Sequence, residues 1–382
     1  MSKFETDKAE LIENLDYLKS LPVKEYTLRK KWDELQTKLF ADRIAVHGAM
    51  HSIWMPTLGT FKINDSGEIT GEIDFPIEQI VNEIKPEIHI CNGKNENDEW
   101  ELMRIFGSSA EYNGGGRRRI RFFVRDAKRR KVLGVGELSS DLPAITSRDK
   151  QVGWDNKTKF KNLRYTAILS TCVPTQPFGF NFNGGKLIAA LSTSQKLREQ
   201  WFIQYNDPLV AITTTSLYGS QSMYNGVKWF KHLPSTDGAM PVTPDDTIYG
   251  KWKRIAKRKF PEKYDKAEKS TGSTIHILNL IGKIAGISFT KDYRHEHKKG
   301  VYFAEVYENT KEFLRGEIKQ SELIIKPKFT EDILEWWRPK AIERYKKVQR
   351  EKRVAEQPLF YNQAYLQPWP MFKKIYRHQL EE

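Results

Sequence analysis

Residues 164–217 carry the pattern that most restricts the fold of this chain. Residues 164–173 are rich in Tyr, Thr, Ile, Leu and Val and are followed by a proline, which is typical of a largely buried strand. After a turn of Asn, Gly and Phe, residues 186–205 place apolar side chains at helical spacings of three and four. Residues 209–217 predict a second strand. Because consecutive strands joined through a helix are usually neighbours, we expect both strands in one sheet.

The glycine-rich turn before this helix is a candidate anion-binding site. Gly184 and Gly185 allow the backbone to approach a ligand closely. A helix that begins at Lys186 presents free N–H groups and the positive end of its dipole. Together with Asn183, these residues predict a site for a phosphate or a carboxylate. A glycine-rich turn before a helix is also commonly just a tight connection, and the sequence leaves both interpretations open.

Tyr224 follows the second strand, and we expect it to lie on a short helix that residues 220–222 cap. A phenol has a pKa of about 10, which suits it to returning a proton to a leaving thiolate. Glu137, on a strand of an expected β-hairpin, and Asp149, beside Arg148, are the candidate general bases. A tyrosine at the start of a helix can equally be a packed aromatic, and an Arg-Asp neighbour pair can be structural.

The order of strand, glycine-rich turn, helix, strand and Tyr224 resembles the core of the GCN5-related N-acetyltransferases. The resemblance implies an α+β fold with a mixed, mostly antiparallel sheet. It also implies Tyr224 as general acid and an acyl-CoA or aminoacyl donor whose pyrophosphate lies at Asn183, Gly184, Gly185 and Lys186. The arginine-bearing pyrophosphate motif that is usual in that family does not occur in this sequence.

A second resemblance rests on short words that occur in a fixed order between about residues 100 and 320. The words are Ser147-Arg148-Asp149, Gly153-Trp154, Asn162-Leu163-Arg164-Tyr165, Gly184-Gly185-Lys186-Leu187, Thr214-Thr215-Ser216-Leu217-Tyr218-Gly219, Lys299-Gly300-Val301-Tyr302-Phe303 and Glu312-Phe313-Leu314-Arg315-Gly316. Together they resemble the DruA-like family of the Druantia anti-phage defence systems, which has relatives in phages and beside transposases. The resemblance implies a role in anti-phage defence or in phage or mobile-element DNA modification, with other proteins of such systems as partners.

The sequence carries 63 Lys and Arg against 49 Asp and Glu, a formal net charge of +14, which favours nucleic acid, and DNA in particular, as a partner. Nine of the fifteen residues 117–131 and six of the nine residues 251–259 are basic. Such clusters neutralise phosphates without reading bases, although a solvated basic face is the alternative. The expected contacts are Arg117, Arg118, Arg119, Arg121, Arg129, Arg130, Lys251, Lys253, Arg254, Lys257 and Arg258.

The chain is long enough for several regions around one main core. We expect an N-terminal helical region at residues 1–58, whose two helices form a hairpin with Thr27 as the cap of the second. The acetyltransferase-like core follows at residues 59–245, and a basic helical region at residues 246–382 completes the chain. Residues 233–246 are rich in Pro, Asp and Thr and are interpreted as a loop.

Several functional classes find no support in the sequence. No apolar run approaches the roughly 20 residues of a membrane span, and the first residues lack a signal peptide's apolar core, so we expect a cytoplasmic protein. With only Cys91 and Cys172, a disulfide framework and a four-cysteine zinc site are excluded. His295 and His297 would lie on one face of a strand without a further ligand nearby, so we predict no metal site. Nucleophile-elbow, Walker and dinucleotide motifs are missing.

Two functions from different classes remain open. In the first, the chain is an acyl- or aminoacyl-transferase that acts on nucleic acid. The turn at residues 183–186 would hold the donor, Tyr224 would act as the acid, and the two basic clusters would hold the acceptor. In the second, the chain keeps this fold without catalysis and is a DNA- or RNA-binding component that recruits or regulates another enzyme.

Overall fold

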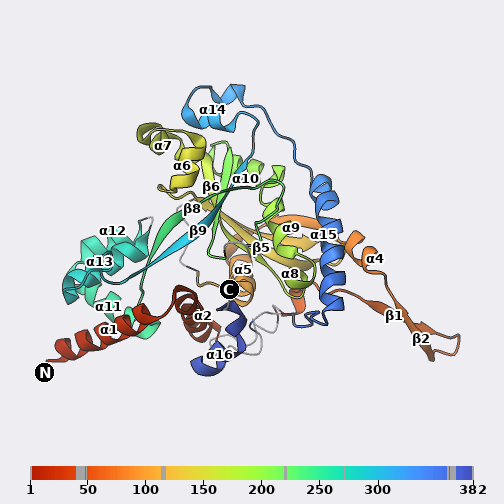
Figure 1. Cartoon of the computed structure of the whole chain (residues 1–382), viewed down its shortest axis with the longest axis horizontal. Helices are drawn as coiled ribbons and strands as arrows, with labels where there is room; N and C mark the ends of the chain where they lie inside the picture. Colours follow the sequence, from red (N-terminus) through yellow and green to blue (C-terminus); the bar gives the residue numbers. More distant parts are fainter. Residues whose placement is uncertain are drawn as a thin grey trace.

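The structure is a computed structural model that describes residues 2–39, 48, 50–112, 118–218, 222–270, 272–358, 361 and 367–380. A seven-stranded sheet with the order β3-β4-β5-β6-β7-β9-β8 forms its centre (Figure 1). The strands are β3 (Pro86–Ile90), β4 (Arg119–Asp126), β5 (Lys131–Ser140), β6 (Thr166–Pro174), β7 (Ala211–Ser216), β8 (Lys231–Pro241) and β9 (Arg294–Glu305). Neighbouring strands are antiparallel except β6 and β7. The described chain therefore has the mixed α+β fold with a mostly antiparallel sheet that the sequence predicts.

The two strands of the opening pattern, β6 and β7, are neighbours in one sheet, as expected, and the structure shows that they are parallel. They pair over three residues each, from Thr166 opposite Ala211 to Ile168 opposite Thr213. Beyond this point β6 continues to Pro174 along β5, whereas β7 continues along β9. The C-terminal halves of the two strands therefore separate within one sheet.

The connection between β6 and β7 contains two helices where the sequence predicted one. These are α9 (Gly184–Leu191) and α10 (Gln195–Tyr205), and the short helix α8 (Phe178–Asn181) precedes them. At the break, the hydroxyls of Ser192 and Thr193 donate to the carbonyl oxygens of Ala189 and Ala190 at 2.6 and 2.8 Å. Such local side-chain hydrogen bonds compete with the continuation of a helix.

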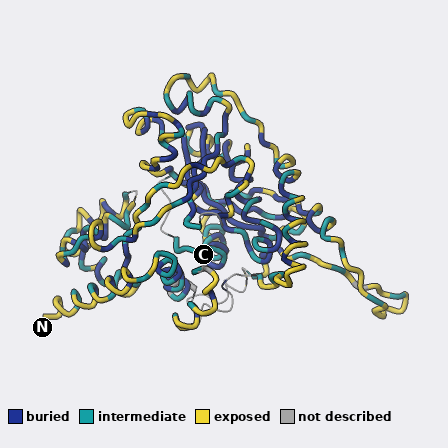
Figure 2. Tube along the Cα trace, in the orientation of Figure 1, coloured by how far each residue is buried: buried dark blue, intermediate teal, exposed yellow. Residues whose placement is uncertain are grey.

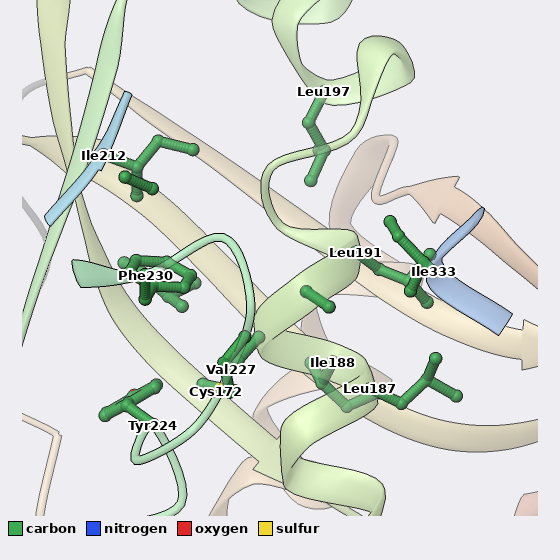
Figure 3. Close-up of a cluster of buried hydrophobic side chains, with 14 of the residues drawn as sticks. Cys172, Leu187, Ile188, Leu191, Leu197, Ile212, Tyr224, Val227, Phe230 and Ile333 are labelled. Carbon is green, nitrogen blue, oxygen red and sulfur yellow. The ribbon is translucent and has the colours of Figure 1, made fainter. Parts of the chain in front are cut away.

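The helix α9 packs between the sheet and the long helix α15 (Thr330–Arg350). Its side chains Leu187, Ile188 and Leu191 are fully or almost fully buried, and Leu191 lies beside Ile333 of α15 (Figure 3). The apolar residues whose spacing predicts a helix here thus form the face of α9 that packs into the main core. On this side of the sheet, α15 also contacts α4 (Ile77–Asn82).

The N-terminal helices share a second core with helices of residues 246–285, at the left of Figure 1. The helices are α1 (Lys3–Ser20), α2 (Val23–Leu39), α11 (Asp246–Lys259), α12 (Pro261–Glu268) and α13 (Ser273–Ala285). Leu15 of α1, Trp252 of α11 and Leu278 of α13 are fully buried in it. The expected N-terminal helices are present, but α2 begins at Val23, so Thr27 lies inside the helix and does not cap it. The division at residues 58 and 245 stays a prediction.

The remaining elements lie around the sheet. They are β1 (Gly59–Ile63), β2 (Ile69–Asp74), α5 (Gly93–Gly107), α6 (Thr146–Val152), α7 (Asn156–Asn162), α14 (Thr310–Arg315), α16 (Trp369–Ile375) and 3-10 turns at Leu163–Tyr165, Gln320–Glu322 and Arg377–Gln379. Buried residues gather in the sheet and the helices against it, while the β1-β2 hairpin and α1 carry many exposed residues (Figure 2). None of the helices described is both long and apolar enough to cross a bilayer.

Two further expectations about local structure were wrong. Most of residues 233–246 belongs to the strand β8, which lies at the edge of the sheet. Edge strands tolerate proline because one side of the strand donates no ladder hydrogen bonds, and Pro234 and Pro241 lie in β8. Tyr224 lies in a turn and not on a helix; its backbone N–H donates to the hydroxyl of Ser222 at 3.3 Å.

Candidate functional site

A cavity of about 340 Å³ lies where β6 and β7 separate. Residues 170–174 of β6 and residues 215–218 at the end of β7 form one side of it, together with Met223 and Tyr224. The other side consists of Tyr26, Thr27 and Lys30 of α2 and of residues 107–112 after α5. Its size falls in the range of small-ligand pockets, roughly 300–1,000 Å³. The cavity is large enough for the reacting end of a substrate.

Tyr224 is a buried wall residue of this cavity. Its side chain lies near Cys172 and Val227 (Figure 3), and its ring is 5.3 Å from that of Tyr302. The hydroxyl is hydrogen-bonded to the side chains of Thr214 and Cys172. Burial raises the pKa of the Tyr224 phenol well above its usual value, and Cys172 adds to this effect. The phenol therefore stays protonated at neutral pH, and it is a weaker acid than a free tyrosine.

Glu137 lies directly behind the cavity wall, with a fully buried side chain. Its carboxylate accepts hydrogen bonds from the Tyr112 hydroxyl at 2.8 Å, the Ser170 hydroxyl at 2.8 Å and Arg121 Nε at 3.0 Å. Tyr112 and Ser170 line the cavity, whereas Glu137 does not. A buried carboxylate with three donors is well satisfied, so this geometry suits it to positioning the two lining hydroxyls.

Asp149 lies on α6 in a network of cations and does not line the cavity. It accepts hydrogen bonds from Arg148 at 2.7 and 3.0 Å, from Lys159 at 3.1 Å and from the indole of Trp154 at 3.2 Å. Arg148 also forms an ion pair with Asp141 at 2.9 Å, and both of these side chains are fully buried. This arrangement supports the structural alternative for the Arg-Asp pair.

Several of the sequence words meet in the same corner of the structure, formed by α6, α7 and α14. Asn162 donates to the carbonyl oxygen of Leu314 at 2.9 Å, and Arg315 donates to the carbonyl oxygen of Val152 at 3.2 Å. Gly153 and Gly316 end α6 and α14 at φ angles of 79° and 77°, a conformation that favours glycine. These words specify a packed corner of the scaffold.

The glycine-rich turn adjoins the cavity but is tightly packed. A Cβ atom at Gly184 would lie 2.4 Å from the ring of Phe178, and one at Gly185 would lie 2.7 Å from the sulfur of Met223. Lys186 Nζ donates to the backbone carbonyl oxygens of Met223 and Asn225. Because Met223 also lines the cavity, its flexible side chain separates the start of α9 from that space.

Four charged residues of the cavity wall were missed by sequence reasoning: Lys30, Arg104, Glu111 and Lys299. Burial raises the pKa of the Glu111 carboxyl, against the opposing effect of the Lys30 ammonium. Burial alone would lower the pKa of Lys30, but Glu111 and Asp33 reverse the shift, so Lys30 stays protonated. Burial lowers the pKa of Lys299. These residues come from distant segments, and the one local signal was the glycine run that follows Glu111 and Tyr112 in sequence.

The first basic cluster is largely engaged within the protein. Arg118 pairs with Asp207 at 2.5 Å, Arg121 with Glu137, and Arg129 donates to the carbonyl oxygen of Met55 at 2.8 Å. Arg130 occupies the hairpin turn at a φ angle of 52°. Arg119 is exposed, and Arg117 lies outside the described residues.

The second basic cluster lies on α11, which is amphipathic. Trp252 and Ala256 are fully buried, whereas the side chains of Arg254, Lys257 and Arg258 are exposed. Lys259 is exposed as well, whereas the remaining two cations are held against the protein. Lys251 pairs with Asp7 and Glu10, and Lys253 lies 4.7 Å from the ring of Tyr249.

His295 and His297 lie on the same face of β9, as expected from their spacing. His295 Nε2 is hydrogen-bonded to the carbonyl oxygen of Leu18 at 3.2 Å, and its ring packs 4.7 Å from that of Tyr26. Within the described residues, no three His, Cys, Asp or Glu side chains come together as metal ligands.

The comparison with known proteins agrees with the second resemblance. The family model described as "Druantia protein DruA" matches residues 62–316, which include the whole seven-stranded sheet and the described cavity wall apart from its α2 residues Tyr26, Thr27 and Lys30. A curated relative, "Druantia protein DruA" of Escherichia coli (strain UMEA 4076-1), is 29% identical over 182 residues. This match covers 42% of the chain and 44% of the relative, so it spans less than half of the relative's length. Because the family model covers well over half of the sequence, the chain belongs to the DruA family.

Proposed function

We propose that the cavity between β6 and β7 is the active site of an acyl- or aminoacyl-transferase that acts on nucleic acid. The family relationship supports a role of this activity in anti-phage defence or in phage or mobile-element DNA modification. One observation carries the proposal: the cavity opens at the point where a parallel strand pair separates, and Tyr224 lies in its wall.

The topology gives further support to a GCN5-related N-acetyltransferase-like core. The elements β6, α9 and β7 and then Tyr224 follow one another in the order of the resemblance, and β6 and β7 are parallel neighbours in a mostly antiparallel sheet. Ligands of open sheets commonly bind where neighbouring strands leave room at their carboxyl ends. The position of the cavity fits this rule.

The wall residues suggest how a proton could move during transfer. Glu111 lines the cavity and has a raised pKa, which suits a carboxylate to accept the proton of the attacking hydroxyl or amine. Tyr224 would give its proton to the leaving group, since its phenol stays protonated at neutral pH. Glu137 would hold Tyr112 and Ser170 in place. Lys30 and Lys299 would stabilise negative charge that develops on the substrate.

Asn183, Gly184, Gly185 and Lys186 would hold a phosphate of the donor, which supplies an activated acyl group when bound. The N–H groups at the start of α9 favour an anion, and the side chain that lies over Gly185 is the flexible Met223. Methionine changes its rotamer at little cost, so the turn and the cavity can form one continuous site. No arginine lies in this turn, and Lys186 provides its positive charge.

A non-catalytic nucleic-acid-binding component is the second candidate. The exposed cations of α11, Arg254, Lys257 and Arg258, favour this function because they lie outside the cavity and form a contiguous basic face. The same face would hold the acceptor if the protein is a transferase. Binding of nucleic acid is thus common to both candidates, and only chemistry separates them.

A phage-challenge assay in cells that carry the complete defence locus tests the first candidate. Tyr224→Phe and Glu111→Gln each remove one proton-transfer group and conserve the shape of the side chain, so both should abolish protection while the protein accumulates normally. Full protection by both variants would contradict the transferase and favour the binding component.

A further inference from the structure

A second cavity, of about 400 Å³, lies against the start of β8 and the end of β9. Its wall comes from residues 228–231, from Phe303 and Glu305 of β9, and from residues 326–328 before α15. It has no lining residue in common with the cavity between β6 and β7. Residues 223 and 224 line the first cavity and residues 228–231 the second, so one segment borders both.

The wall of the second cavity is strongly basic, because it contains Lys228, Lys231, Lys326 and Lys328. Lys328 is 7% exposed, and its ammonium donates to the backbone carbonyl oxygen of Glu305 at 3.3 Å. Burial lowers the pKa of Lys328 to about 8, and the nearby positive charges of Lys326 and Arg198 add to this effect. A buried ammonium beside other cations is stabilised when an anion binds.

The acidic groups around this cavity already have partners. The Glu305 carboxylate pairs with Lys311 at 3.3 Å, and Glu308 pairs with Lys326 at 3.3 Å. Lys228 is exposed, and the Lys231 ammonium donates to the uncharged amide oxygen of Gln151 at 3.4 Å. Glu308 offsets the charge of Lys326, so the surplus of positive charge in the described wall comes from Lys228, Lys231 and Lys328, and it favours an anionic ligand.

Aromatic side chains lie next to these cations. Trp229, Phe230 and Phe303 belong to the wall, and Trp229 is held edge-to-face by Trp336 with a centroid distance of 5.3 Å. Lys228 Nζ lies 5.7 Å from the Trp229 ring centre. Cations that hold phosphate, combined with an aromatic ring on which a base can stack, are the usual means of binding single-stranded nucleic acid. A binding site for inorganic phosphate alone would need no indole.

We propose that this second cavity binds a nucleotide unit, with Lys228, Lys326 and Lys328 on the phosphate and Trp229 stacked on the base. The source of the unit is either a free nucleotide or a residue of a single strand, and the chemistry of recognition is the same for both. The inference concerns binding and holds whether or not the first cavity transfers an acyl group.

Fluorescence anisotropy of a labelled single-stranded oligonucleotide tests this proposal on the full chain. Trp229→Ala should weaken binding by about tenfold, because one stacked base contributes about 1–3 kcal/mol. Trp229→Phe should restore most of the affinity. Lys328→Met should weaken oligonucleotide binding. Lys328→Arg should keep the affinity at pH 7, and the affinity of this variant should change less than that of the wild type when the pH rises above 8. Lys347→Ala, at an exposed position of α15, is the matched control for loss of one positive charge.

Competition distinguishes the two sources. If a mononucleotide displaces the oligonucleotide through a Trp229-dependent site, the cavity takes a free nucleotide; if only unlabelled oligonucleotide competes, it takes a strand. Unchanged affinity in both Trp229→Ala and Lys328→Met, or equal competition by inorganic phosphate and mononucleotide, would overturn the proposal. Tyr224→Phe should bind the oligonucleotide as well as the wild type does. The transferase proposal and the nucleotide-binding proposal can therefore be contradicted independently of each other.

Discussion

Ile168 of β6 faces Thr213 of β7 in the last parallel pair that the two strands form. From this pair onward β6 follows β5 and β7 follows β9, and the cavity between them is lined by the residues that no longer pair with each other. The position of the candidate active site is therefore a consequence of strand register, and side chains from α2 and from the segment after α5 close it on the other side.

Tyr224→Phe and Tyr224→Ala separate a chemical role from a packing role. The Phe variant loses one hydroxyl with its hydrogen bonds to Thr214 and Cys172, so we expect a loss of about 1 kcal/mol in the free energy of unfolding. The Ala variant leaves a cavity and should lose about 3–5 kcal/mol. Chemical denaturation measures both values. A Phe variant that keeps full biological activity would exclude Tyr224 as the acid.

The buried ion pair of Arg148 and Asp141 should be important for stability. Arg148→Met leaves the Asp141 carboxylate buried without its cation, which should lower the free energy of unfolding by about 3–5 kcal/mol. Lys257→Ala, which breaks a 3.9 Å pair with Asp265 at the surface, should change it by less than about 1 kcal/mol. Urea denaturation of the two variants provides the comparison. Equal effects would contradict the structural role of this corner.

Lys328 should make stability depend on pH in a defined window. Its pKa in the folded protein is about 8, below the value of 10.5 for the free side chain, so the unfolded chain binds the proton more tightly. Stability should therefore rise with pH from about 8 to about 10.5, and the cost of the buried charge should be fully present below pH 8. Lys328→Met removes this cost, which amounts to on the order of 3 kcal/mol.

The measurement is the difference in unfolding free energy between Lys328→Met and the wild type. The difference should be largest at pH 7 and shrink toward pH 10. Comparing the two proteins at each pH cancels the titration of all other groups. A difference that does not change with pH would show that the Lys328 ammonium is hydrated and not buried in the folded protein.

Charge reversal on α11 should weaken nucleic-acid binding. Arg254→Glu, Lys257→Glu and Arg258→Glu together should reduce the affinity for duplex DNA and lower the slope of log affinity against log salt by about 3, since each lost phosphate contact contributes about 0.9. Lys347→Glu, at an exposed position of α15, is the control. Arg118 is unsuitable for this test because its substitution breaks the pair with Asp207. An unchanged salt slope in the triple variant would show that nucleic acid binds to a surface other than α11.

The parts of the fold that depend on local pattern could be predicted. The alternation and composition of β6 and β7 identify buried strands, and the 3.6-residue spacing on α11 identifies which of its residues are buried. The prediction of secondary structure was wrong where competing local effects determine whether a helix or strand continues. The hydroxyls of Ser192 and Thr193 divide a helix, and the prolines of β8 are compatible with a strand only because β8 lies at an edge.

The candidate site could be predicted only in part, for a physical reason. Tyr224 and the turn at Gly184 and Gly185 belong to a continuous stretch whose order suggests their proximity. Lys30, Glu111 and Lys299 reach the same cavity through the packing of α2 and the segment after α5 against the sheet, and no local periodicity encodes that packing. Most described cations of the first basic cluster contact other groups of the protein, and the sequence does not reveal this because those groups lie elsewhere in the chain.

Mass spectrometry of nucleosides tests the central claim most directly. Nucleic acid would be isolated from phage-infected cells that express the wild type, Tyr224→Phe, or Thr215→Trp, which fills the cavity beside β7, with Thr215→Ser as the matched control. We predict an acylated or aminoacylated nucleoside with the wild type and with Thr215→Ser, and none with the other two variants at equal protein levels. The same nucleosides in all samples, including cells without the protein, would contradict the transferase.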